Sequence, residues 1–162
     1  MSTTWKNSDG LVVHFGTRAT DNDRPVIVAG TGLAKELVVE FTYADLPVGP
    51  VDGDSGVIHI PAGGYLKSAR IQVDTAFADG TSLTVGTAQQ DGTAIDADGI
   101  FTAAELATAN LTAGAVIEAS GGADVGTVID GTNDAYITVA ATGTYTAGTA
   151  RIVIEYVPKY DA

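Results

Sequence analysis

The segment LVVEFTY, residues 37–43, is the strongest indicator of the fold class. Positions 37, 39, 41 and 43 are apolar or aromatic, whereas positions 40 and 42 carry Glu and Thr. Successive side chains of a β-strand point to opposite faces, so this period of two indicates a strand with one buried and one wet face.

Outward from this segment, further β-branched and apolar runs recur along the chain, separated by Gly-rich or Asn/Asp turns such as Gly121-Gly122 and Asp130-Gly131. The predicted strands are residues 57–61, 65–77, 83–86, 115–118, 127–129, 136–139 and 150–157. Short strands about 8–12 residues apart with turn signals between them are typical of a sandwich or barrel. The sequence therefore predicts an all-β, jelly-roll-like β-sandwich of about eight strands, a fold that leaves few free edges.

One short helix is predicted within this β pattern. Thr102 and Glu105 have the spacing of a capping box, in which the Glu side chain reaches back to the first backbone N–H. The helix would continue through Leu106 to Asn110 and end before Gly114.

The chain divides into two predicted parts. Residues 1–32 hold Trp5, a short apolar run at 11–15 and a polar turn at 21–23, which favours an extended N-terminal arm or hairpin. Residues 33–162 form the predicted β-sandwich domain.

Charge is distributed unevenly. The 162 residues carry 20 acids and 8 bases, a net charge of −12, and no Lys or Arg occurs between Ile71 and Ala150. Nucleic-acid affinity comes from neutralising phosphates with Lys and Arg, so we expect no nucleic-acid partner. The sequence contains no Cys, no secretory leader pattern and no long apolar run, so we expect no disulfide and no membrane partner, and synthesis in the host cytoplasm.

No catalytic pattern stands out, and we expect neither enzymatic activity nor a cofactor. His14 and His59 lie in separate apolar runs, and no G-x-S-x-G nucleophile motif occurs. An enzyme of the jelly-roll oxygenase type would need two His and a carboxylate on facing strands. With His14 and His59 as the chain's two His residues, such an enzyme is a third hypothesis, after structural and ligand-binding roles.

A calcium site is a weak candidate at residues 94–105. Asp96, Asp98 and Glu105 match positions three, five and twelve of an EF-hand loop, with Gly99 at the sharp turn. Position one is Ala94, however, and the segment before it is predicted as a strand. An acidic turn that caps the short helix is therefore the favoured interpretation, and we expect no metal.

Three segments carry a resemblance to a known family: ADLP at residues 44–47, VIHIPAGGYLKSARIQV at 57–73 with TAFADG and LTVGT after it, and YTAGTARIVIEY at 145–156. Over residues 41–157 the chain resembles head proteins of tailed bacteriophages, including capsid decoration (cement) proteins. The resemblance implies a virion structural protein that binds the major capsid protein on the outer surface of the head. It also implies self-association, as a trimer rather than a dimer.

The N-terminal arm is the predicted capsid-binding clamp. Apolar anchors and bases occur together there, and Trp is a preferred interface residue. The candidate capsid-binding residues are Trp5, Lys6, Val13, Phe15, Arg18 and Arg24. The competing interpretation is that Trp5 and Phe15 cover an open end of the sandwich itself.

A ligand-binding sandwich is the alternative function, either a phage fibre or receptor-binding head or a carbohydrate-binding module. Such sites present aromatic platforms. Tyr43, Tyr65, Tyr136 and Tyr156 fall in predicted strands, which leaves Tyr145 and Tyr160 as the Tyr side chains expected to be free.

Overall fold

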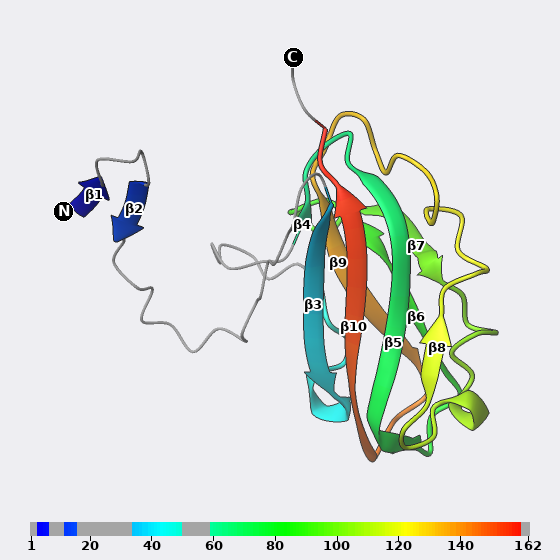
Figure 1. Ribbon diagram of the computed structural model, residues 1–162. Coiled ribbons are helices and arrows are strands. Elements are labelled where there is room, and N and C mark those ends of the chain that lie inside the picture. The colour runs from blue at the N-terminus through cyan, green and yellow to red at the C-terminus, as the bar shows by residue number, and fades with distance from the viewer. Residues whose placement is uncertain (1–2, 7–11, 16–33, 50–58, 160–162) are drawn as a thin grey trace.

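A computed structural model describes residues 34–49 and 59–159 in full and the backbone of residues 3–6 and 12–15. The short strands β1 (Thr3–Lys6) and β2 (Val12–Phe15) pair antiparallel as a two-stranded hairpin. Eight further strands form two four-stranded antiparallel sheets that pack face to face (Figure 1). These strands are β3 (Lys35–Thr42), β4 (His59–Ile60), β5 (Tyr65–Ala78), β6 (Ser82–Ala88), β7 (Ala94–Phe101), β8 (Val116–Glu118), β9 (Ala135–Thr142) and β10 (Ala147–Val157).

The strand order is that of a jelly roll. One sheet runs β3-β10-β5-β8 and the other β4-β9-β6-β7. Strands of the first half therefore pair with strands of the second in nested fashion: β3 with β10, β4 with β9, β5 with β8 and β6 with β7. This nesting is two Greek keys wound together, and it confirms the predicted jelly-roll sandwich.

The core lies between the sheets and follows the alternation seen in the sequence. On β10, Ile152 and Ile154 have no exposed surface, and they pair on one side with β3 and on the other with β5. Ile152 lies opposite both Val39 and Ile71, which are also buried. Apolar burial across these three neighbouring strands is the main stabilising contribution, at about 1.5–3 kcal/mol for each large side chain.

The first predicted strand ends one residue earlier than expected. Thr42 is the last residue of β3, and Tyr43 begins a 3-10 helix, η1 (Tyr43–Asp45), with its side chain 42% exposed. The Asp45 carboxylate accepts hydrogen bonds from the backbone N–H and the hydroxyl of Thr42, both at 2.8 Å. This local cap turns the chain before Tyr43 can join the buried face.

The predicted helix from Thr102 to Asn110 is reduced to a turn followed by the 3-10 helix η2 (Thr108–Asn110). The predicted Thr102–Glu105 contact is confirmed, because Glu105 accepts from the backbone N–H and the hydroxyl of Thr102, but it closes a turn and starts no helix. The segment does not continue as an α-helix because Leu106 and Leu111 are both drawn fully into the core. Burial in the sandwich outweighs helix propensity here.

Two strand predictions were wrong. Residues 94–101, interpreted as an acidic turn, form the edge strand β7. Residues 127–129 form no strand, and Val128 makes only an isolated bridge to Tyr65. A large bulge interrupts the pairing of β7 with β6. Val85 pairs with Phe101 and Thr87 with Asp96, so three residues of β6 lie opposite six of β7.

Gly148 occupies a position that only glycine fits. Its φ is +137°, and a Cβ there would overlap the ring of Phe77. The Phe77 ring is held in place by Phe41, at a centroid distance of 5.9 Å, and by Tyr145, edge-on at 5.5 Å. The backbone of β10 must therefore pass directly over this aromatic cluster.

We expect Gly148→Ala to lower the free energy of unfolding by about 2–3 kcal/mol, because it adds both backbone strain and overpacking. Urea denaturation followed by tryptophan or Tyr fluorescence and circular dichroism measures the change. Gly131→Ala is the matched control, since an added Cβ there meets nothing within 4 Å. Equal stability of the two variants would contradict the packing described for Phe77.

Candidate functional site

The two sheets differ in charge. Strands β4, β9, β6 and β7 contain no Lys or Arg, and we call their sheet the base-free sheet. The other sheet carries Lys35 on β3, Lys67 and Arg70 on β5, and Arg151 on β10, together with several acids. We call it the mixed-charge sheet. Jelly-roll winding thus collects the sandwich's strand-borne Lys and Arg residues in one of its two sheets.

Ion pairs cross the strands of the mixed-charge sheet. Arg151 Nη2 donates to both carboxylate oxygens of Asp74, at 2.9 and 3.0 Å, and Lys67 Nζ lies 2.9 Å from Glu155 Oε2. The hydrogen bond and charge of Lys67 lower the pKa of Glu155. Exposed pairs of this kind contribute at most about 1 kcal/mol each, so they shape the surface more than they stabilise the fold.

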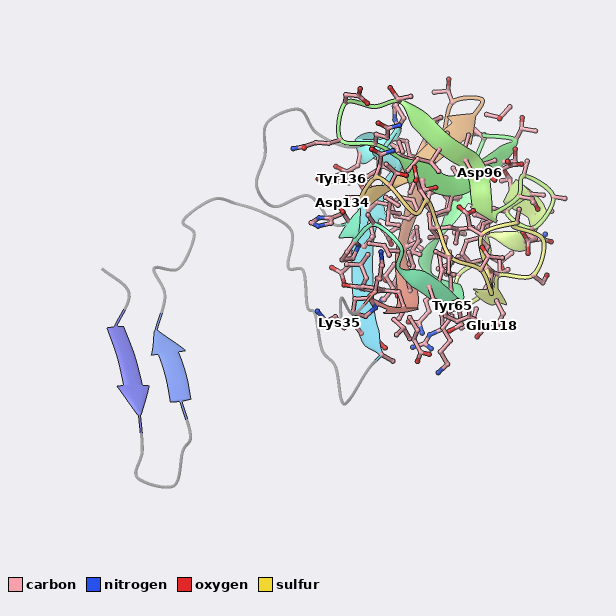
Figure 2. All side chains as sticks on the ribbon, turned by 90° about the horizontal axis from the view of Figure 1, so that it is seen from above. Lys35, Tyr65, Asp96, Glu118, Asp134 and Tyr136 are labelled. Atoms are coloured by element: carbon pink, nitrogen blue, oxygen red, sulfur yellow. The ribbon has the colours of Figure 1, made fainter. Side chains whose placement is uncertain are left out.

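An apolar cluster lies at one end of the mixed-charge sheet. Tyr65 pairs with Val157 at the end of β10 and bridges to Val128, and the side chains of Tyr65 and Val128 are 40% and 59% exposed. Lys35, the first residue of β3, lies opposite Tyr156 at the same end. Figure 2 looks down on this end and labels Lys35 and Tyr65. We name Tyr65, Val128 and Val157 the apolar end cluster.

The hairpin holds four of the six residues predicted to bind the capsid. Trp5 and Lys6 lie on β1, and Val13 and Phe15 lie on β2. In their antiparallel register Trp5 lies opposite Val13, so an apolar residue of β1 is paired with an apolar residue of β2. The other two residues, Arg18 and Arg24, lie outside the described residues.

The structure separates the candidate calcium ligands. Asp96 and Asp98 lie on β7, whereas Glu105 points both of its oxygens at hydrogen-bond donors. Across the described part of the chain, no three His, Cys, Asp or Glu side chains form a group suited to a metal ion. The Asp96 carboxylate instead accepts from its own chain, from the backbone N–H of Asp98 at 3.3 Å.

Glu105 ties two loops together. Its Oε2 accepts from the N–H and hydroxyl of Thr102, and its Oε1 accepts from the N–H and hydroxyl of Ser120 and from the N–H of Gly121, at 2.7–3.0 Å. Burial raises the pKa of Glu105, but the backbone N–H groups of Thr102, Ser120 and Gly121 outweigh it and lower the pKa to about 2. The sequence spacing predicted the contact of Glu105 with Thr102, whereas nothing in the local sequence predicted its contact with Ser120, 15 residues away.

The pKa of Asp124 is shifted in the opposite direction, upward. Burial raises the pKa of its carboxyl, the Thr87 hydroxyl donates to Oδ2 at 3.2 Å and lowers it, and the nearby Asp96 raises it further. Thr87 itself has no exposed surface. The Asp124 charge therefore lies near the core, and within the described residues its single side-chain donor is Thr87.

The His and Tyr predictions had mixed outcomes. His59 lies on β4 with its Nε2 3.9 Å from Asp134 Oδ2 and its ring 5.1 Å from that of Tyr136, contacts that the sequence did not indicate. Tyr145, expected to be free, is only 6% exposed and its hydroxyl is 3.0 Å from that of Thr108, so that prediction was wrong. Tyr160 lies outside the described residues.

We expect Glu105→Gln to destabilise the sandwich by about 1–2 kcal/mol at pH 7, because charge-assisted hydrogen bonds are weakened and water screens part of the effect. The folded pKa lies below the value in the unfolded chain. The contribution of Glu105 is therefore complete above about pH 5 and is lost as the pH falls toward 2. Thermal unfolding at pH 7, 4 and 2.5 measures it.

The control for this prediction is Glu118→Gln, which makes the same chemical change at an exposed position of β8. A difference between the Glu105 variant and the parent chain that stays constant from pH 7 to 2.5 would contradict the role assigned to the charge.

We expect Asp124→Asn to raise the melting temperature at pH 7, because the amide can still accept from Thr87 without placing a charge near the core. A carboxyl whose folded pKa is raised costs stability above that pKa and costs nothing once both folded and unfolded forms are protonated. The gain should therefore vanish at about pH 3. A gain that is the same at both pH values would show that charge is not its cause.

Comparison with known proteins identifies solved structures of similar fold but no protein family. No family model and no curated protein matches the chain. Among solved structures, a chain of the cyanophage Pam1 capsid asymmetric unit is 17% identical, with a TM-score of 0.49, covering 88% of this chain and 100% of that one. A chain of the capsid of Ralstonia phage GP4 is also 17% identical, with a TM-score of 0.46, covering 83% and 92%. At these scores neither structure carries an argument about function.

Proposed function

We propose that this chain is a virion structural protein, a capsid decoration or cement protein that binds the outer surface of a tailed-phage head. Its partner is the major capsid protein, and its role is to stabilise the shell by binding across it. A ligand that binds only one state of an assembly stabilises that state by mass action. The proposal assigns the chain no bond-making chemistry.

The β1–β2 hairpin carries this proposal. A lone two-stranded hairpin is marginally stable in water and needs a third surface to pack against. In the described residues β1 and β2 pair only with each other, and each brings apolar residues to the hairpin: Trp5 on β1, Val13 and Phe15 on β2. A binding arm that becomes fully stable against a partner fits this arrangement.

The mixed-charge sheet supports an orientation on the shell. The sheet's first strand starts at Lys35, at the same end as the exposed Tyr65 and Val128, so the chain that leads from the arm joins the sandwich at this end. Arg70 adds a cation on the outer face of β5, opposite Glu118 of β8. We propose that this end faces the capsid and that Lys6, Arg18 and Arg24 of the arm pair with capsid acids.

With that end on the shell, the outer face of the base-free sheet would stay exposed to solvent. Its strands carry Asp96 and Asp98 without a compensating base, and the loops around it add further acids. A surface of one sign keeps particles apart by repulsion. Self-association, as a trimer rather than a dimer, follows from the resemblance to decoration proteins.

We expect the full chain to co-sediment with purified heads of its phage prepared without it, and removal of residues 1–20 to abolish this binding. Circular dichroism and thermal unfolding of the truncated chain check that the sandwich still folds. In the full chain, Trp5→Ala should weaken binding at least about ten-fold, as expected for an interface anchor.

Thr4→Ala, in the same strand, is the control for Trp5→Ala and should bind like the parent chain. Retained binding by the truncated chain would move the interface to the sandwich. Failure of the full chain to bind heads would overturn the decoration role itself.

A receptor- or carbohydrate-binding function is the second candidate. The specific observation in its favour is a polar pocket on the base-free sheet, between the turn after β6 and the loop before β9. The pocket lies at the same end of the sandwich as the apolar end cluster, because Asp134 accepts a hydrogen bond from the backbone N–H of Ala62, three residues before Tyr65.

A further inference from the structure

The pocket lies where the β6–β7 turn approaches the start of β9. Its volume is about 260 Å³, and its lining residues are Gln89, Gln90, Asp91, Asn133, Asp134 and Tyr136. Tyr136 pairs with Ala88 on one side and with His59 on the other, which places the pocket at one end of the base-free sheet. Figure 2 shows Asp134 and Tyr136 together on one side of the sandwich.

Three of the polar side chains are fixed by hydrogen bonds to the surrounding chain. The backbone N–H of Thr93 donates to Asp91 Oδ1, and that of Ala62 donates to Asp134 Oδ1, both at 2.9 Å. Asn133 Nδ2 donates to Asp130 Oδ2 at 3.1 Å. Such bonds hold the two carboxylates and the amide in position before any ligand arrives, which lowers the entropy cost of binding.

Other polar groups that line the pocket have hydrogen-bond donors and acceptors that are not used within the fold. The side-chain amides of Gln89 and Gln90 make no hydrogen bond within the described residues, and each offers one acceptor and two donors. Asn133 keeps its Oδ1 as an acceptor, because its bond to Asp130 uses Nδ2. The pocket therefore presents donors and acceptors together on planar groups.

Tyr136 is the aromatic residue that lines the pocket. Its side chain is 8% exposed, and its ring lies against the His59 imidazole at a centroid distance of 5.1 Å. The Asp134 Oδ2 atom lies 3.9 Å from His59 Nε2. A ligand would thus meet Tyr136, which lies near His59, beside the Asp134 carboxylate.

We propose that this pocket binds a neutral saccharide unit. Each sugar hydroxyl is both a donor and an acceptor, which matches side chains that supply both, and a site built from such groups discriminates by hydrogen bonding. An ammonium ligand would leave the amide N–H donors without partners. Two carboxylates disfavour an anionic sugar, and the volume lies below the about 300–1,000 Å³ typical of drug-sized ligands, close to the size of one sugar ring.

Saturation-transfer NMR of the full chain with D-glucose, D-galactose and D-mannose, each tested alone, examines this proposal. We expect at least one hexose to bind with a Kd on the order of 1 mM, given about 12 non-hydrogen atoms and ordinary ligand efficiency. N-acetylneuraminic acid and n-butylamine, as anionic and cationic probes, should bind at least ten-fold more weakly. A stronger signal from either charged probe, or no signal from any hexose, would overturn the proposal.

The double variant Gln89→Ala/Gln90→Ala locates the site. It should lower hexose affinity at least ten-fold without changing the melting temperature, because neither amide is bonded in the fold. Gln72→Ala, the same change on β5 of the mixed-charge sheet, is the matched control and should bind like the parent chain. If the double variant loses stability, Gln90→Ala alone repeats the test. Hexose binding unchanged in these variants would place the site elsewhere, whatever the outcome with phage heads.

Discussion

The pairing of β10 with both β3 and β5 is the constraint on which the sandwich depends. These are three of the four strands of the mixed-charge sheet, with β10 between the other two, and the inward positions of β10 include Ile152 and Ile154, which have no exposed surface. Because β3 and β10 are about 110 residues apart in the chain, their contact fixes the nested winding of every strand between them. The division of Lys and Arg between the two sheets follows from that winding.

A long segment without bases must be held by contacts other than ion pairs of its own. Residues 71–150 rely on backbone pairing, on apolar burial and on acids that accept backbone N–H groups. Thr42 with Asp45 and Thr102 with Glu105 form the same turn-closing contact at two places in the fold. In both, the acid serves as a structural acceptor, so the high acid count does not by itself indicate a metal or catalytic site.

The sequence predicted the sandwich well where alternation dominates, as in β3, β5 and β10, and poorly where local motifs compete with packing. Residues 94–105 have the spacing of a calcium loop, but residues 94–101 form the bulged edge strand β7, and no local pattern in the sequence indicated this pairing with β6. The Thr102–Glu105 contact was predictable from spacing, whereas the Ser120 and Gly121 contacts of Glu105 depend on tertiary structure. The pocket around Tyr136 joins residues 89–91 with 133–136, a proximity that only the pairing of β6 with β9 creates.

Nested pairing also determines when this chain can fold during synthesis on the ribosome. While β10 is still inside the exit tunnel, β3 and β5 lack the strand that lies between them in the sheet. Their unpaired edges can then pair with other chains. The mixed-charge sheet can close only after residues 147–157 emerge. We therefore expect nascent chains that still lack an exposed β10 to be the species most prone to aggregation and most often bound by chaperones.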